Sequence, residues 1–270
     1  MLDIESITNT IINDDCINIL KQLPDKCIDL VVTSPPYDNL RTYNGTLEWN
    51  FEIFQNIAKE LARVLKDGGV IVWIVNDSTV NGSETGTSFK QALYFKELGL
   101  NIHDTMIWNK ENSPFNHNCR YTQVFEYMFV LSKNMPKTTN IICDRKNKRY
   151  GEQVHGTERT AKGTTKQRSL VQKSKTIKEF GNRHNIWNIF PEKNNTTGHP
   201  AVFPYTLAHD HIISWSNEND LILDCFSGSG TTAVACHNLE RRFICIEKDY
   251  DYWKASVERL ENAQAQLKLF

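Results

Sequence analysis

Short apolar segments alternate with segments of helical periodicity along most of this 270-residue chain, and this alternation constrains the fold more than any other feature. The apolar segments are bounded by turn residues, as buried parallel strands are. Strands that alternate with helices predict an α/β fold with a mostly parallel, doubly wound sheet. The expected strands are Thr10–Asp14, Cys27–Thr33, Val70–Val75, Ile102–Trp108, Tyr127–Leu131, Leu221–Phe226 and Phe243–Glu247, and the expected helices are Cys16–Gln22, Phe51–Leu65, Ser88–Leu98, Tyr205–Ser214, Thr231–Leu239 and Tyr250–Leu267.

A glycine-rich turn follows the expected strand that contains Asp224. Gly228 and Gly230 stand just before a helix. Glycines allow a tight turn and a close approach of the backbone to a ligand, and a helix N-terminus favours a carboxylate. The next strand ends at Glu247, where an acid can hold ribose hydroxyls. The dinucleotide pattern is incomplete, since Ala233 stands where its third glycine would be, and this disfavours NAD.

The strand near the N-terminus ends in Thr33-Ser34-Pro35-Pro36-Tyr37. An exocyclic amine on cytosine or adenine is a poor nucleophile because its lone pair is delocalised into the ring. The Ser34 hydroxyl and the Pro35 carbonyl can each accept one of its N–H groups, and two prolines stiffen the turn. Tyr37 offers a face for stacking on a flipped-out base. In parallel sheets ligands bind at the carboxyl ends of strands, where both motifs lie.

Together these motifs resemble the β-class DNA amino-methyltransferases, which use S-adenosylmethionine. The chain has Asp-Cys-Phe-Ser-Gly-Ser-Gly-Thr-Thr from Asp224 to Thr232, with Cys225 where the family usually has proline. The resemblance implies a Rossmann-like class I methyltransferase fold in a circularly permuted order, because the catalytic half precedes the cofactor half. Residues 1–132 would form the catalytic half and residues 199–270 the S-adenosylmethionine-binding half.

The resemblance also implies a role for each matching residue. Ser34, Pro35, Pro36 and Tyr37 would be catalytic, and Glu247 would hold the ribose. Asp15 and Cys16 match the segment that contacts the adenine. The methionine end would be lined by His199, Pro200, Phe203, Asp224, Phe226, Gly228, Ser229, Gly230 and Thr231.

A cationic segment interrupts the α/β pattern. Residues 133–183 hold fourteen Lys or Arg residues and four acidic residues, a net charge of +10 in a chain whose total is −1. A basic segment on an acidic body suggests a surface that faces a polyanion. We expect residues 133–198 to form a target-recognition insert for duplex DNA, with Lys146, Lys148 and Arg149 on the phosphates, and Arg41 as a further DNA contact.

The expected product is N4-methylcytosine at a defined site, within a restriction-modification system. Family members with Ser at the position of Ser34 more often modify cytosine, and those with Asp more often modify adenine, so an N6-adenine enzyme is the alternative. Two alternatives are more distant. One is RNA or protein as the substrate, and the other is a non-enzymatic nucleic-acid-binding domain. Methylation of cytosine C5 is disfavoured because no Pro-Cys dipeptide supplies its nucleophile. A cognate restriction endonuclease and a homodimer are further expectations.

The remaining composition predicts a cytoplasmic protein. The seven cysteines form no Cys-x-x-Cys pair and show no zinc spacing with histidine, so no metal site and no disulfide are expected. The N-terminus does not resemble a signal peptide. The longest apolar runs are too short to span a bilayer, so we expect no membrane association.

Overall fold

The computed structural model describes residues 2–36, 49–110, 119–169, 175–191 and 204–266. The chain forms two compact units, one made of Met1–Asn140 with Asn185–Phe270 and the other of Ile141–His184. We describe each unit by itself.

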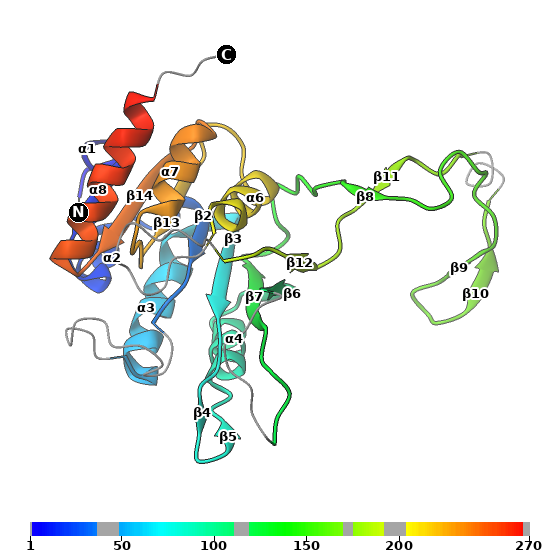
Figure 1. The fold of residues 1–270 in the computed structure, drawn as a ribbon, viewed down its shortest axis with the longest axis horizontal. Coiled ribbons are helices and arrows are strands. Elements are labelled where there is room, and N and C mark those ends of the chain that lie inside the picture. Colours follow the sequence, from blue (N-terminus) through cyan, green and yellow to red (C-terminus); the bar gives the residue numbers. More distant parts are fainter. Residues whose placement is uncertain (1, 37–48, 111–118, 170–174, 192–203, 267–270) are drawn as a thin grey trace. The chain divides into compact units, whose positions relative to one another are not determined.

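The larger unit is built on one eight-stranded sheet (Figure 1). The strands lie in the order β1 (Thr10–Asn13), β14 (Arg242–Glu247), β13 (Leu221–Asp224), β2 (Ile28–Thr33), β3 (Leu65–Val75), β7 (Phe125–Ser132), β6 (Asn101–Asn109) and β12 (Ile186–Asn188). All neighbours pair in parallel except at β7, which runs antiparallel to both β3 and β6. The mostly parallel sheet confirms the predicted fold class.

Helices cover both faces of this sheet, which makes it doubly wound. Residues of α2 (Cys16–Gln22), α3 (Phe51–Val64) and α4 (Thr87–Glu97) pack in one hydrophobic cluster with one set of strand side chains. Residues of α6 (Tyr205–Trp215), α7 (Thr231–Asn238) and α8 (Tyr250–Ala265) pack in the other cluster with the alternate set. The alternation follows from the two-residue period of a strand. The predicted helices are therefore confirmed, with ends shifted by a residue or two.

The largest boundary difference is at β3. It begins at Leu65, directly after α3, rather than at Val70 as predicted. The sequence Lys66-Asp67-Gly68-Gly69 predicts a helix C-terminus instead, because a basic last turn followed by glycine is typical of one. Gly68 has φ +78°, and a Cβ on Gly69 would lie 2.9 Å from the Leu65 side chain. Glycine is thus required where the strand bends, as at a bulge.

Four short elements of the larger unit were not predicted, and one of them is β12, which lies within the predicted basic insert. Helix α1 (Ile4–Ile7) precedes β1, and β4 (Thr79–Val80) and β5 (Ser83–Glu84) form a hairpin after β3. Asn81 and Gly82, which connect the hairpin strands, have φ of 49° and 80°. An Asn-Gly pair with positive φ at both residues is a strong hairpin signal that the sequence reading overlooked.

The smaller unit lies within the predicted basic insert, 133–198. It holds two antiparallel pairs, β8 (Arg145–Lys146) with β11 (Phe180–Gly181) and β9 (Thr157–Arg159) with β10 (Thr165–Gln167). An ion pair of 2.5 Å joins Arg183 to Asp144 near its ends, and this contact lowers the pKa of the Asp144 carboxyl. After this unit the chain returns to the main sheet as β12.

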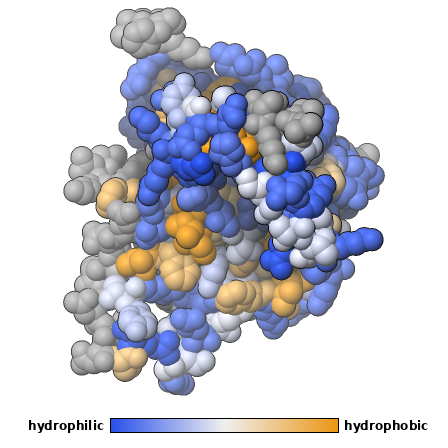
Figure 2. Space-filling model, turned by 90° about the vertical axis from the view of Figure 1, so that its right-hand side faces the viewer, coloured by the Kyte–Doolittle hydropathy of each residue, from blue (hydrophilic) through white to orange (hydrophobic). Residues whose placement is uncertain are grey.

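The surface mixes hydrophilic and hydrophobic side chains. Figure 2 shows hydrophobic residues gathered in the centre and lower part of the visible face, with hydrophilic residues around them. Exposed large apolar residues include Phe89 and Leu93 on α4 and Ile186 on β12. Of the helices that the structure describes, none has the length and apolar character needed to cross a membrane. All seven cysteines are free thiols, and Cys225 and Cys245 are buried in the core as predicted.

Candidate functional site

The two sequence motifs lie at the same edge of the main sheet. Ser34–Pro36 follow β2, and the glycine-rich turn follows β13, its parallel neighbour (Figure 1). The main-chain pairing of these strands ends at Leu223 and Val31. After β2 the chain reaches α3 on one face of the sheet, and after β13 it forms α7 on the other. This divergence is a topological switch point, where α/β sheets bind their ligands.

Asp224 joins the two motifs by hydrogen bonds. Its Oδ1 accepts from the Thr33 hydroxyl at 2.7 Å and from the Phe226 amide at 3.1 Å. Its Oδ2 accepts from the Thr232 hydroxyl at 2.6 Å. The side chain is fully buried, and burial raises the pKa of its carboxyl although the hydrogen bonds from Thr232 and Thr33 oppose this. With its oxygens turned to these donors, Asp224 organises the site from inside the protein.

The glycine-rich turn is tied to the next strand by Glu247. The Gly228 amide donates to Glu247 Oε2 at 2.7 Å, and the Asp249 amide donates to Oε1 at 2.9 Å. Gly228 and Gly230 have φ of 51° and 75°, a region that favours glycine. Burial raises the pKa of the Glu247 carboxyl. A carboxylate has about four acceptor sites, so two amides leave capacity for hydroxyl donors of a ligand.

Helix α8 braces the turn from the protein side. Arg259 Nη1 donates to the Ser229 carbonyl and hydroxyl, each at 3.2 Å, and to the Thr231 hydroxyl at 3.0 Å. A Cβ on Gly230 would lie 3.0 Å from the Cβ of Ser256, so glycine is needed for this close packing. The hydroxyls of Ser229 and Thr231 therefore bond to α8, while the amides of Ser227 and Gly230 donate to the carbonyls of Ile246 and Ser227, so the turn is held from within the protein.

The third strand end of this edge carries Asp15 and Cys16. Asp15 caps α2 by accepting from the Ile17 amide at 3.1 Å, and its other oxygen lies 3.0 Å from Lys248 Nζ. The Cys16 side chain is buried in the core beneath α2. Since β1 pairs in parallel with β14, Asp15 stands at the same edge as Glu247. The structure thus places Asp15, Glu247 and the glycine-rich turn along one edge of the sheet, and the ligand contacts predicted for them stay predictions.

A sequence model of the DNA methylase family that modifies N6 and N4 positions matches residues 28–258. This match spans both motifs and most of the chain. The chain belongs to the N6/N4 DNA methylase family.

Individual relatives agree with this assignment. The methylase is 50% identical over 250 residues to the orphan methyltransferase M.BamHII of Bacillus amyloliquefaciens, with 90% of this chain and 92% of that protein covered. It is 28% identical over 267 residues to the DNA adenine methyltransferase YhdJ of Escherichia coli, with coverage of 94% and 83%. The solved M1.HpyAVI–SAM complex is 27% identical, with a TM-score of 0.60 and coverage of 93% and 99%. The methylase is an S-adenosylmethionine-dependent enzyme that acts on DNA.

The residues at the sheet edge suit this methyl donor. Ribose hydroxyls need acceptors, which the Glu247 carboxylate provides. The methionine carboxylate needs backbone donors, which the start of α7 at Thr231 provides. When bound, the donor supplies a methyl group activated by a positive sulfonium. Glu247 and the start of α7 are the groups that would hold it.

Several predicted site residues fall outside the residues that the structure describes. These are Tyr37, Arg41, His199, Pro200 and Phe203. The DNA-contact candidates Lys146, Lys148 and Arg149 are described and exposed in the smaller unit, where Arg149 forms an ion pair of 2.6 Å with Glu152. Their roles stay predictions.

Four residues at the site were missed by the sequence reading. Thr33 and Thr232 bond Asp224, Arg259 bonds the turn, and Trp49 packs edge-on against Phe226 with ring centroids 5.5 Å apart. Thr33 and Thr232 belong to the two motifs, so their position next to the predicted site residues could have indicated them from the sequence. The contacts of Arg259 and Trp49 come from chain folding, which a single sequence does not reveal.

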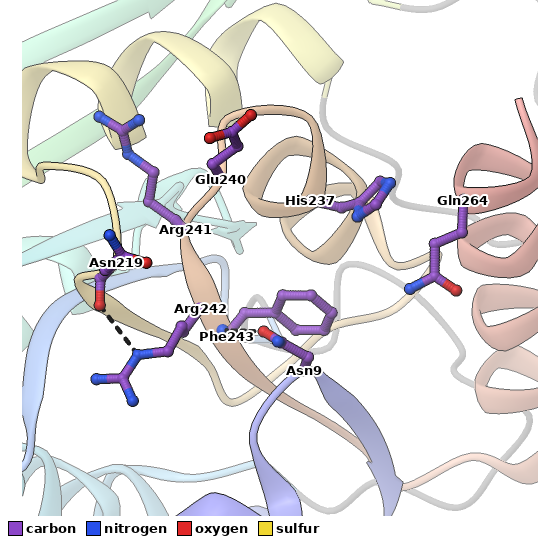
Figure 3. A pocket seen from close by; sticks show the side chains of 8 residues that line it. All are labelled: Asn9, Asn219, His237, Glu240, Arg241, Arg242, Phe243 and Gln264. Carbon is purple, nitrogen blue, oxygen red and sulfur yellow. Dashed lines mark hydrogen bonds between the residues drawn. The ribbon is translucent and has the colours of Figure 1, made fainter. Parts of the chain in front are cut away.

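A hollow of about 320 Å³ lies at the opposite edge of the sheet (Figure 3). It lies where β14 begins, and its wall includes Asn9 and Asn219, which precede β1 and β13. Its arginines already bond the chain, since Arg242 Nε donates to the Asn219 carbonyl at 3.0 Å and Arg241 donates to Ser216. This hollow is therefore not part of the methyl-transfer site.

Proposed function

We propose that this methylase is a β-class enzyme that transfers a methyl group to the exocyclic N4 of cytosine in duplex DNA. The observation that carries the proposal is the position of Ser34. It follows Thr33, whose hydroxyl bonds the same carboxylate that anchors the cofactor turn. The acceptor motif and the donor turn therefore meet at one switch point, as methyl transfer requires.

Ser34 and Pro35 would prepare the amine for attack. The Ser34 hydroxyl accepts one N–H of the amine and the Pro35 carbonyl accepts the other, which draws the lone pair out of the ring. Pro35 and Pro36 are buried, so the carbonyl is held by a rigid turn. As the nitrogen gains the methyl group, the bond from that methyl group to the donor sulfur breaks and a neutral thioether is left. The nitrogen becomes acidic and would release one proton past the Ser34 hydroxyl to bulk water. Tyr37 would stack on the base taken out of the duplex.

The choice of cytosine rests on the hydroxyl at position 34. A hydroxyl is a weaker acceptor than the carboxylate that adenine enzymes of this family more often carry. The adenine product is the second candidate, and the similarity to a relative named as a DNA adenine methyltransferase favours it. Both candidates share the fold, the methyl donor and the roles of Ser34 and Pro35.

DNA would bind to the basic smaller unit and be methylated within a short recognition sequence. Exposed lysines and arginines of residues 141–184 can neutralise phosphates and position the duplex. In this proposal the mark protects DNA from a cognate restriction endonuclease. A homodimer is a further part of the proposal, and the mass of the purified protein in solution by light scattering tests it.

Nucleoside mass spectrometry tests the product. DNA from a methylation-free host that expresses the methylase should contain N4-methylcytosine, and a Ser34→Ala variant should yield much less of it. N6-methyladenine as the sole product would replace the cytosine assignment. Absence of any methylated base, with a folded protein that binds S-adenosylmethionine, would overturn the DNA substrate itself.

A further inference from the structure

A buried hydrogen-bond bridge crosses the switch point between the two halves of the site. The Thr33 hydroxyl on β2 donates to Asp224 Oδ1 at 2.7 Å, and the Thr232 hydroxyl on α7 donates to Asp224 Oδ2 at 2.6 Å. All three side chains are fully buried. The bridge therefore links the strand that carries the acceptor motif to the helix that closes the donor turn.

The bridge lies beyond the last main-chain pair of the two strands. Pairing of β2 with β13 is recorded at Leu30 with Ile222 and at Val31 with Leu223, and not further towards their ends. Thr33 and Asp224 are the residues at which the strands then separate towards opposite faces of the sheet. With no backbone ladder there, the side chains supply the lateral connection.

A purely structural contact would not need these groups. Burying a carboxylate costs free energy unless hydrogen bonds offset it, and an apolar pair would fill the same space more cheaply. Valine has nearly the shape of threonine and a high strand propensity. In the described part of the chain, the Thr33 hydroxyl has Asp224 as its partner, with the Cys225 sulfur at 3.7 Å.

We propose that Thr33 is a positioning residue, whose hydroxyl sets the placement of Ser34 relative to the donor turn through the Asp224 carboxylate. The inference rests on the proposed role of Ser34 as an acceptor for the target amine. Methyl transfer requires the amine in line with the methyl group, and a misplacement of about 1 Å can cost on the order of 100-fold in rate. The bridge would fix the distance between Ser34 and the donor turn without contacting the target amine or the methyl donor.

The test separates turnover from binding in the full-length methylase. Thr33→Val removes the hydroxyl and keeps the shape, Thr33→Ser keeps the hydroxyl, and Thr10→Val is the matched control. Thr10 is likewise a terminal strand residue, the first of β1, and it loses one hydroxyl bond, 2.7 Å to the Ile7 carbonyl, but it stands at the opposite edge of the sheet. Rates come from single-turnover methyl transfer, and cofactor affinity from calorimetry.

Thr33→Val should lower the methyl-transfer rate by about tenfold or more, with the Kd for S-adenosylmethionine changed less than about twofold. Thr33→Ser should recover most of the rate, and Thr10→Val should keep all of it. An unchanged rate in Thr33→Val would overturn the proposal. So would a proportional loss of cofactor affinity, because the hydroxyl would then serve only the donor turn.

A second variant guards against a folding defect. Thr33→Ala removes the same hydroxyl with less bulk and leaves the bonds of Asp224 to Thr232 and to the Phe226 amide in place. If Thr33→Val does not fold, Thr33→Ala must show the selective loss of rate, and a normal rate there sinks the idea. The role of Ser34 is judged separately, since a Ser34→Ala variant with normal turnover would overturn the proposed function whatever the bridge variants do.

Discussion

Arg259 on α8 donates to both the carbonyl and the hydroxyl of Ser229, each at 3.2 Å. A third contact, 3.0 Å to the Thr231 hydroxyl, spans the start of α7. One guanidinium thus holds three oxygens of the donor turn and its helix. All three contacts come from one nitrogen, Nη1, whose two N–H groups are shared among the three oxygens. The C-terminal helix therefore braces the glycine-rich turn from the protein side.

We expect Arg259→Met to weaken S-adenosylmethionine binding by about tenfold, which corresponds to about 1.4 kcal/mol. The buried oxygens of Ser229 and Thr231 lose their donor, so the turn relaxes before the cofactor binds. Isothermal calorimetry measures the effect. Arg242→Met is the matched control, since Arg242 bonds Asn219 and Glu5 at the opposite edge of the sheet. Equal affinities in both variants would mean that α8 does not organise the turn.

Lys110 and Glu126 form an ion pair at the carboxyl edge of β6. The Glu126 side chain is 4% exposed and that of Lys110 is 21% exposed, so this pair is largely removed from water. Loss of one partner leaves the other charge buried, which typically costs about 3–5 kcal/mol. Lys110→Met should lower the free energy of unfolding by about 3 kcal/mol in denaturant titrations.

The double variant Lys110→Met with Glu126→Gln should recover part of that loss, since no unpaired carboxylate remains. Lys26→Met is a useful contrast, because the Lys26 and Asp67 side chains are 56% and 53% exposed and water can replace the lost ion pair. A double variant as unstable as Lys110→Met would show that packing of the lysine stem, and not charge, carries the effect.

The sequence predicted the sheet, its helices and the two strand-end motifs, because these depend on local periodicity and on glycine and proline chemistry. Both ends of the helix Cys16–Gln22 were predicted correctly, since Asp15 before it is a typical N-cap residue. The start of β3 was missed because Gly68 and Gly69 follow a basic residue, as at a helix C-terminus, and the packing of Gly69 against Leu65 is visible only in the folded chain.

The sequence indicated which motif residues to consider at the site, but not the contacts that these residues make. Asp224 was expected to line the methionine end, and its buried oxygens bond Thr33, Thr232 and the Phe226 amide. Burial of a carboxylate is a property of the folded molecule, so a motif does not reveal it. The contacts of Arg259 depend on how α8 packs on the turn, and residues about thirty positions apart in sequence carry no local signal of it.

Glu247 predicts a pH dependence of cofactor binding. Burial raises the pKa of its carboxyl, so protonation begins at a higher pH than for an exposed glutamate. Only the carboxylate keeps all its acceptor sites for ribose hydroxyls, so affinity should fall as pH drops through this raised pKa. For stability the sign is opposite: the raised pKa favours the folded state below the unfolded value, and that contribution is lost as pH rises through the folded value.

Calorimetric titrations with S-adenosylmethionine at a series of pH values test this. The methylase should lose affinity towards acid pH, and Glu247→Gln should bind weakly with little pH dependence. Glu258→Gln, an exposed residue of α8, should keep both the affinity and its pH dependence. A pH profile that Glu247→Gln leaves unchanged would assign the titration to another group.

The smaller unit predicts a salt-dependent contribution to DNA binding. Each phosphate contact releases counterions, so the logarithm of the affinity falls linearly with the logarithm of salt concentration, with a slope of about 0.9 per contact. Lys146, Lys148 and Arg149 are exposed there, and their joint change to Glu should weaken DNA binding and reduce that slope by up to about 3. Fluorescence anisotropy at several salt concentrations measures both quantities, and cofactor affinity should stay unchanged.

The control has the same change of charge on the other unit. Lys21, Lys59 and Lys96 are exposed on α2, α3 and α4, and their joint change to Glu lowers the net charge of the chain equally. If binding depends on overall charge alone, both triple variants weaken it alike and the assignment of the smaller unit to DNA is wrong. If phosphates dock on the smaller unit, the slope falls only in the first variant, because released counterions report contacts and not total charge.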